Sequence, residues 1–139
     1  MKIIYWSGTG NTEAMANLIA KGISNNGKEA EVLSVDKVKI DDIKNENILI
    51  LGCPSMGAEM LEEGEFEPFI QELENFGQGK KALLFGSYGW GDGEWMRNWE
   101  EQMKLYGFEI PIDPVIVNES PEGEDEELCI KYGEKIAKL

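Results

Sequence analysis

A chain of 139 residues, 42% apolar and 29% charged, has the size and composition of one globular domain with one hydrophobic core. Its 27 acidic and 13 basic residues give a formal charge of -14, which repels nucleic acids and anionic membranes and excludes them as partners. Histidine is absent, which removes the usual general base near neutral pH and the commonest zinc ligand. We therefore expect neither a hydrolase nor a metal site.

In chain order, short apolar runs alternate with segments of helical period, which is typical of βαβ units. We expect a strand over residues 3–6, a helix around 15–23, a strand over 30–35, a short helix over 38–43, a strand over 48–51, a helix around 66–73, a strand over 82–85, a helix around 95–103, a strand over 108–117 and a helix around 128–136. Pro111 and Pro114 place the last strand at an edge.

The predicted fold class is α/β, a doubly wound five-stranded parallel sheet in the order 2-1-3-4-5 with helices on both faces. The first, third and fourth strands are apolar almost throughout, as central strands are when helices cover both faces. In such a sheet a ligand binds beyond the carboxyl ends of the strands, here between the first and third. Helical spacing assigns Trp95 and Trp99 to the core, while the role of Trp6 is left open.

The first loop at that edge has the composition of a phosphate site. It lies between a strand and a helix and reads Ser7, Gly8, Thr9, Gly10, Asn11, Thr12. The glycines let the backbone approach an anion, and the hydroxyl and amide side chains stand beside free N–H groups of the helix N-terminus. It is neither a Walker A loop nor a dinucleotide fingerprint. The alternative is a plain strand-to-helix turn.

The other two loops are suited to a flat ligand. After the third strand, Met56 offers a polarizable contact, Gly57 an unusual backbone geometry and Glu59 an acceptor for a ring N–H. After the fourth strand, Trp90 lies between two glycines, where it is better placed to stack on a planar ligand than to enter a core. Ordinary surface loops are the alternative for both.

Taken together, the three loops resemble those of the flavodoxins, the short clostridial type in particular. The matching segments are residues 4–12 (IYWSGTGNT), residues 51–57 (LGCPSMG) with Glu59, and residues 84–93 (LFGSYGWGDG). The likeness covers essentially the whole chain and implies one flavodoxin-like FMN-binding domain over residues 1–139. It departs at Ala58, which has no polar side chain beside Gly57.

The resemblance also implies which residues bind the cofactor. FMN would be held non-covalently, its phosphate by the six residues of the first loop with Ser87, and its ring between Met56 and Trp90. Glu59 would lie near ring N3, and in relatives the peptide at the position of Gly57 turns its carbonyl toward flavin N5. The remaining expected contacts are Pro54, Ser55, Ala58, Tyr88, Gly89, Gly91 and Asp92. Asn118 is a further candidate for the ring or ribose.

The implied function is a low-potential one-electron carrier, not an enzyme, that shuttles FMN between semiquinone and hydroquinone in place of ferredoxin. Eight acidic residues and no basic one occur over residues 45–78, which opposes the second electron. The partners would be redox enzymes with basic docking patches that also accept ferredoxin. The alternative is an FMN-dependent NAD(P)H:quinone-type reductase of the same fold. A receiver-like signalling domain is disfavoured because Ser7 and Gly8 stand where it needs acids.

The cysteines and the hydropathy of the chain indicate its cellular compartment. Cys53 and Cys129 have no C-x-x-C spacing, so the sequence predicts neither a disulfide framework nor a redox motif. No apolar run approaches the roughly 18 residues of a membrane span. We expect a cytoplasmic monomer.

Overall fold

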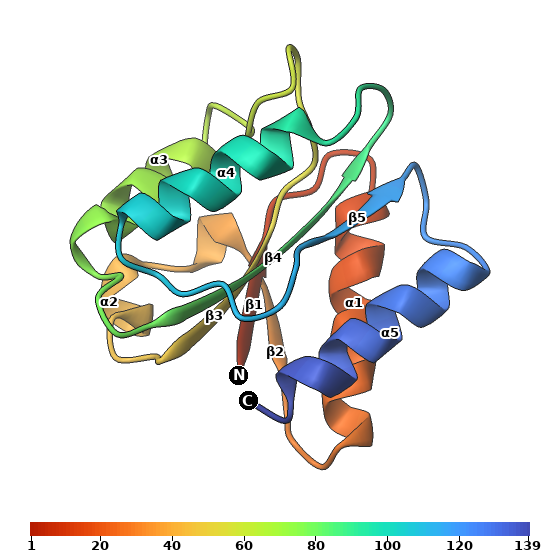
Figure 1. The fold of residues 1–139 in the computed structure, drawn as a ribbon, viewed down its shortest axis with the longest axis horizontal. Coiled ribbons are helices and arrows are strands. Elements are labelled where there is room, and N and C mark those ends of the chain that lie inside the picture. The colour runs from red at the N-terminus through yellow and green to blue at the C-terminus, as the bar shows by residue number, and fades with distance from the viewer.

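Five parallel strands form one sheet in the computed structural model, which describes residues 1–139, in the order β2-β1-β3-β4-β5 (Figure 1). The strands are β1 (Lys2–Tyr5), β2 (Glu31–Ser34), β3 (Ile48–Gly52), β4 (Lys81–Tyr88) and β5 (Val115–Asn118). The helices are α1 (Asn11–Asn25), α2 (Ile40–Ile43), α3 (Phe66–Gln71), α4 (Glu94–Leu105) and α5 (Glu124–Ile136), with short 3-10 turns η1 (Val35–Lys37) and η2 (Glu72–Asn75). The predicted fold class and strand order are confirmed. None of the helices has the length and apolar character needed to span a bilayer.

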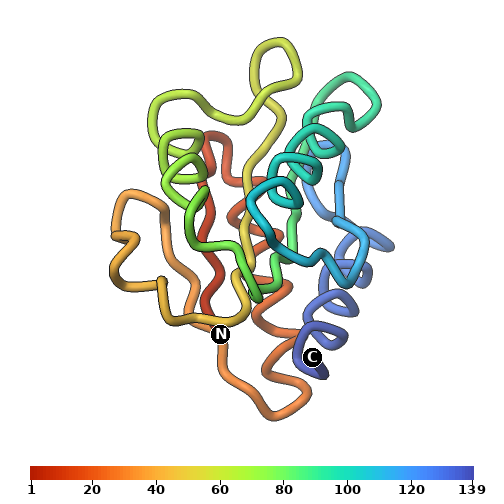
Figure 2. Tube along the Cα trace, turned by 60° about the vertical axis from the view of Figure 1, so that its left-hand side comes forward, coloured from red at the N-terminus to blue at the C-terminus, as the bar shows by residue number.

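The sheet separates two hydrophobic cores, because successive side chains of a strand point to opposite faces. Ile3 and Ile50 pack with the residues of α1 and α5, whereas Ile4 and Leu51 pack with those of α3 and α4. All four are fully buried. Figures 1 and 2 show these helix pairs on opposite sides of the sheet. The apolar character of the central strands therefore reflects coverage on both faces.

Helices α1 and α5, which cover one face of the sheet, are in direct backbone contact. A side chain at Gly22 of α1 would overlap the carbonyl oxygen of Ile130, and one at Gly133 of α5 would overlap that of Ile19. The two glycines thus allow α1 and α5 to approach more closely than any other residue type would. This role could not be assigned before the two helices were placed side by side.

The fifth strand is shorter than predicted. Residues 108–114 pair with the sheet only through a bridge between Lys81 and Glu109, and the regular ladder begins after Pro114. Pro111 and Pro114 have no N–H to donate, so this segment cannot continue the ladder. The expectation of a strand over residues 108–117 is wrong in its start, while its edge position is confirmed.

The fourth strand is longer than predicted and changes the third loop. Ser87 and Tyr88, which lie beyond the strand expected over residues 82–85, are the last residues of β4. Ser87 pairs with Val117 and Tyr88 with Asn118. The neighbouring strand prolongs the ladder here, an effect that the local sequence does not reveal. The loop proper covers residues 89–93.

Candidate functional site

A cleft of about 230 Å³ lies at the carboxyl ends of β1, β3 and β4, where the predicted site was expected. These ends and their loops are at the top of Figures 1 and 2. The lining of the cleft comes from the three loops, from the end of β4 and from the residue after β5. The lining residues are Trp6, Gly8, Thr9, Asn11, Pro54, Ser55, Met56, Ser87, Tyr88, Gly89 and Glu119. A wider hollow of about 520 Å³ lies between η1 and α3, and none of the three loops reaches it. The chemistry of the sequence therefore points to the smaller cleft.

The first loop leaves several donors free at the start of α1. The Ser7 hydroxyl accepts the N–H groups of Gly10, at 3.1 Å, and of Glu13, at 3.3 Å, so that the loop closes on itself. The N–H groups of Gly8, Thr9 and Thr12 have no acceptor within the protein. Free N–H groups at a helix N-terminus, with the helix dipole behind them, form an anion site without any basic side chain.

A buried hydroxyl pair connects the first loop to β4. Thr12 Oγ1 and Ser87 Oγ are 3.0 Å apart, and the two residues are 1% and 4% exposed. A hydroxyl has one donor and two acceptor sites, so each partner keeps capacity for further hydrogen bonds. The pair thus connects the start of α1 to Ser87, which lines the cleft.

The second loop is a tight hairpin held by two backbone bonds. Met56 N–H donates to Met60 at 2.8 Å, and Met60 N–H donates to Met56 at 2.9 Å. Gly57 has φ 51° and Glu59 has φ 55°, both in the left-handed region. Such a backbone is strained for a residue with a side chain, at a cost of order 1–3 kcal/mol, and is found where surrounding contacts impose it. Glu59 is therefore held in place by more than its own conformational preference.

Glu59 carries one of the only two buried side-chain polar atoms that lack a hydrogen-bond partner. The unpartnered atom is the carboxylate oxygen Oε1, and the carboxyl group lies against Gly91 of the third loop. A buried acceptor without a donor is costly. A ligand that offers an N–H at this point would remove that cost.

Glu62 anchors the chain that follows the hairpin. Its carboxylate accepts the N–H groups of Gly64 at 2.6 Å, Glu65 at 2.7 Å and Phe66 at 2.9 Å, which are free donors at the start of α3. Burial acts to raise the pKa of Glu62, but these three bonds outweigh it and hold the pKa below the ordinary value of 4.5. Glu62 N–H in turn donates to Cys53 Sγ at 3.5 Å, and burial raises the pKa of that thiol, which stays protonated.

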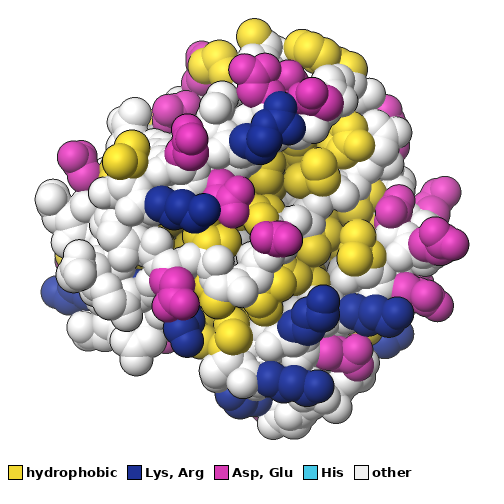
Figure 3. Space-filling view, in the orientation of Figure 1, with side chains coloured by type: hydrophobic (Ala, Val, Ile, Leu, Met, Phe, Trp, Pro, Cys, Tyr) yellow, Lys and Arg dark blue, Asp and Glu magenta, His cyan; other side chains and the backbone are white.

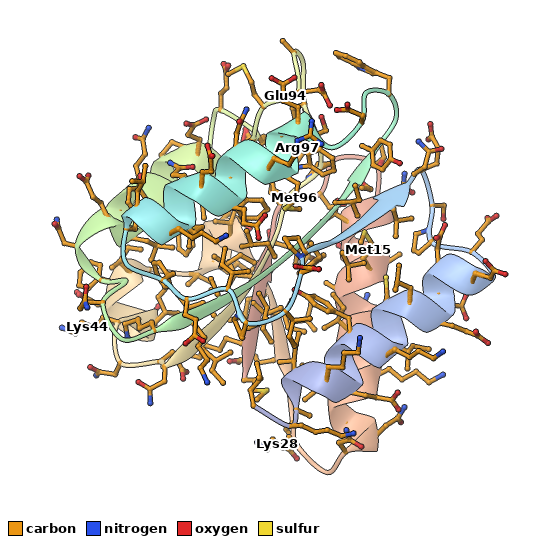
Figure 4. All side chains as sticks on the ribbon, viewed as in Figure 1. Met15, Lys28, Lys44, Glu94, Met96 and Arg97 are labelled. Carbon is orange, nitrogen blue, oxygen red and sulfur yellow. The ribbon has the colours of Figure 1, made fainter.

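The third loop is fastened to α4. The Arg97 guanidinium donates to the Asp92 carboxylate at 2.9 Å and to the Asp92 carbonyl at 3.0 Å. This side-chain hydrogen bond lowers the pKa of Asp92 and raises that of Arg97. Figure 4 shows Arg97 at the end of α4 next to the loop. Trp90, 63% exposed, is thus carried by a fastened loop.

Not every expected site residue lines the cleft. Ser7, Gly10 and Thr12 belong to the first loop but are not part of the cleft lining. Residues 57–59 of the hairpin and residues 90–92 of the third loop are not part of the cleft lining either.

Two residues that the sequence analysis did not assign line the cleft, Trp6 and Glu119. Trp6 lies against Gly8, and Glu119 follows β5 at the same edge of the sheet. Asn118, named as a candidate contact, instead donates to the carbonyl of Tyr88 at 3.2 Å. Position just after a strand end was the signal that could have identified Glu119.

Comparison with known proteins identifies the family. The flavodoxin family model matches residues 3–133. The chain is also 58% identical to the flavodoxin of Clostridium beijerinckii over 139 residues, which is 100% of both chains. The chain belongs to the flavodoxin family.

Other flavodoxins agree with this assignment. That of Megasphaera elsdenii is 44% identical over 138 residues, covering 99% of this chain and 98% of the relative. The solution structure of its two-electron reduced form superimposes with a TM-score of 0.91 and covers 99% of this chain and 98% of that one. A flavodoxin from the domain Archaea, 30% identical, gives a TM-score of 0.87 with coverage of 99% and 97%.

Flavodoxins are FMN-binding electron carriers and not enzymes, so the predicted function class and cofactor are confirmed and the reductase alternative is not favoured. The residues present fit this cofactor. The free N–H groups of the first loop suit a phosphate, and the unpartnered Glu59 Oε1 suits a ring N–H. Bound FMN supplies one-electron chemistry, and the chain supplies the contacts that bind it and set its potentials.

Proposed function

We propose that the three loops hold FMN with its phosphate at the start of α1. The free N–H groups of Gly8, Thr9 and Thr12 would bind the phosphate oxygens, assisted by the hydroxyl and amide groups of Ser7, Thr9, Asn11, Thr12 and Ser87 and by the backbone freedom of Gly10. Hydrogen bonds to a charged group contribute roughly 1.5–3 kcal/mol each before desolvation is subtracted. Several such bonds compensate for the lack of a basic residue between Lys2 and Lys21.

The ring would lie between Met56 and Trp90. These residues are 38% and 63% exposed, so a planar ligand between them would bury apolar surface that is now open to water. Glu59 would accept the ring N–H, and the remaining contacts would come from Pro54, Ser55, Gly57, Ala58, Tyr88, Gly89, Gly91 and Asp92. The observation that carries this proposal is the buried, unpartnered Oε1 of Glu59.

The charge around the site favours a low potential for the second electron. The second loop and α3 carry acidic residues and no basic one over residues 45–78. Lys28 and Lys44 lie at the far end of the molecule from Arg97 (Figure 4), and Arg97 itself is paired with Asp92. Negative charge nearby opposes a further electron on the ring. The first electron would be favoured by a carbonyl from the peptide at Gly57. Gly57 has a left-handed φ of 51°, a backbone conformation that glycine adopts more easily than other residues.

The partners would be redox enzymes with a basic patch, including enzymes that also accept ferredoxin. The apolar side chains of Met56, Met60 and Trp90 are exposed in the loops at this end, among acidic residues. Figure 3 shows acidic side chains around its upper edge and most of the visible Lys and Arg in its lower half. An uneven charge of this kind steers association, so added salt should slow electron transfer to such a partner. A rate that did not change with salt would contradict this part of the proposal.

Residues 1–139 would act as one FMN-binding domain and as a monomer. Cys53 and Cys129 are both free and buried. Free thiols without a disulfide are the usual state in a reducing compartment, so we place the protein in the cytoplasm.

Fluorescence titration of the apoprotein with FMN and with riboflavin tests the site. Tight quenching by FMN and much weaker quenching by riboflavin would support phosphate recognition by the first loop. Equal affinity for both would contradict it. A reductive titration then separates the functions: two well-separated one-electron steps are expected of the carrier, and rapid two-electron reduction by NADPH would support the reductase instead.

A further inference from the structure

The carboxyl group of Glu59 packs at a defined position on the third loop. Its backbone is held in the left-handed region at φ 55° by the hairpin of residues 56–60, and its carboxyl group packs directly against Gly91. One carboxylate oxygen is buried there without a donor. The left-handed backbone and the desolvated acceptor of Glu59 are both unfavourable in free energy, so contacts in the surrounding structure must hold this residue in place.

The Glu59 carboxyl group can pack there because residue 91 has no side chain. A Cβ placed on Gly91 would overlap Oε1 and Cδ of Glu59. Gly93, in the same loop and with a similar positive φ of 96° against 87°, makes no such contact, since a Cβ there would meet Ile116 at 3.1 Å and Arg97 at 3.6 Å. The two glycines therefore share backbone strain and differ in their relation to Glu59.

The loop that carries Gly91 is tied to α4 at the next residue. Arg97 holds both the carboxylate and the carbonyl of Asp92, the residue that follows Gly91. Glu59, in contrast, also borders a cavity of about 150 Å³ between α3 and α4. A side chain at position 91 would therefore displace the Glu59 carboxyl group while the fold around it persists.

We propose that Gly91 is the positioning residue for Glu59: by leaving room for the carboxyl group it fixes the acceptor at the edge of the FMN ring and joins the loops that carry Met56 and Trp90. The inference rests on the proposed function for the role of Glu59 toward FMN. The packing of Glu59 on Gly91 belongs to the chain itself and is measurable in the apoprotein.

Two double-mutant cycles test the inference, one with Gly91→Ala and Glu59→Ala and a matched one with Gly93→Ala and Glu59→Ala. Each variant is measured in three ways: urea unfolding of the apoprotein, FMN dissociation constant by fluorescence, and the potential of the second electron. Both alanines carry the cost of a positive φ, so the Gly93 cycle accounts for backbone strain.

We expect Gly91→Ala to weaken FMN binding about tenfold when Glu59 is present and less than threefold in the Glu59→Ala background. The second potential should rise in Gly91→Ala, because a negative charge leaves the ring edge, and should not change when Glu59 is already absent. Apoprotein unfolding should show the same non-additivity, and the Gly93 cycle should be additive in all three readouts.

Additive behaviour of Gly91→Ala and Glu59→Ala, in a wild-type protein that binds FMN, would overturn the inference and leave the proposed function intact. A wild-type protein that does not bind FMN would overturn the proposed function, and an additive apoprotein cycle would then remove the packing role of Gly91 as well.

Discussion

Replacing Glu62 by Gln should destabilise the protein through the segment that joins the hairpin to α3. The carboxylate accepts three backbone N–H groups at 2.6, 2.7 and 2.9 Å. Gln keeps one acceptor oxygen at this position and loses the negative charge beside the helix N-terminus. One carboxylate oxygen accepts Glu65 and Phe66 and the other accepts Gly64, so Gln keeps at most two of the three bonds, and those two lose the carboxylate charge. For a partly exposed carboxylate this is about 1–2 kcal/mol of unfolding free energy. For a domain of this size that corresponds to roughly 4–8 °C in Tm.

The pH dependence of this difference has a definite sign. The pKa of Glu62 in the folded protein is held below its ordinary value of 4.5. A depressed carboxyl pKa stabilises the folded state above the unfolded pKa, and this contribution is lost as the pH falls through the folded pKa. The difference between wild type and Glu62→Gln should therefore be constant near neutral pH and shrink below about pH 4.5.

Thermal and urea unfolding of the apoprotein, followed by circular dichroism over that pH range, measures the effect. Glu63→Gln is the matched control, because Glu63 is an exposed neighbour and its loss changes the net charge equally. If Glu63→Gln destabilised the protein as much as Glu62→Gln, or if the Glu62→Gln deficit did not shrink at low pH, the assigned hydrogen bonds would not be the cause.

Three further substitutions follow from the structure. Trp90→Ala should weaken FMN binding by at least about fivefold, since stacking and buried area are lost, yet hardly alter apoprotein unfolding because the side chain is 63% exposed; an unchanged dissociation constant would place the ring elsewhere. Gly57→Thr should narrow the gap between the two one-electron potentials with little loss of FMN affinity, since Gly57 has φ 51° and a Cβ there would meet no atom within 4 Å; an unchanged gap in spectroelectrochemistry would refute a role for the turning peptide. Gly133→Ala should lower the unfolding free energy by about 1–3 kcal/mol despite better helix propensity, because its Cβ would overlap the Ile19 carbonyl; a stabilised variant in urea would contradict direct contact of α1 and α5.

Local composition determined much of this protein. Apolar runs and helical spacing identified five strands, their order and the assignment of Trp95 and Trp99 to the core, both of which are 1% exposed. Glycine and hydroxyl residues placed directly after strand ends predicted the edge of the sheet where the cleft lies, because parallel strands bring their carboxyl ends to one edge. Even the predicted acceptor role of Glu59 needed only its residue type and its place beyond β3.

Long-range contacts decided the rest. The extension of β4 to Tyr88 depends on β5, and the late start of β5 depends on where its prolines fall against β4. No local pattern in the acidic segment around Glu62 shows that three N–H groups converge on its carboxylate.

The roles of Gly22, Gly133 and Gly91 also depend on long-range contacts. A glycine looks alike in sequence whether it serves a turn or leaves room for a distant partner. Only the folded chain shows which carbonyl or carboxyl group occupies the space that a side chain would need. Residue types determine which chemistry is available at a strand end, and tertiary packing determines which groups are close enough to use it.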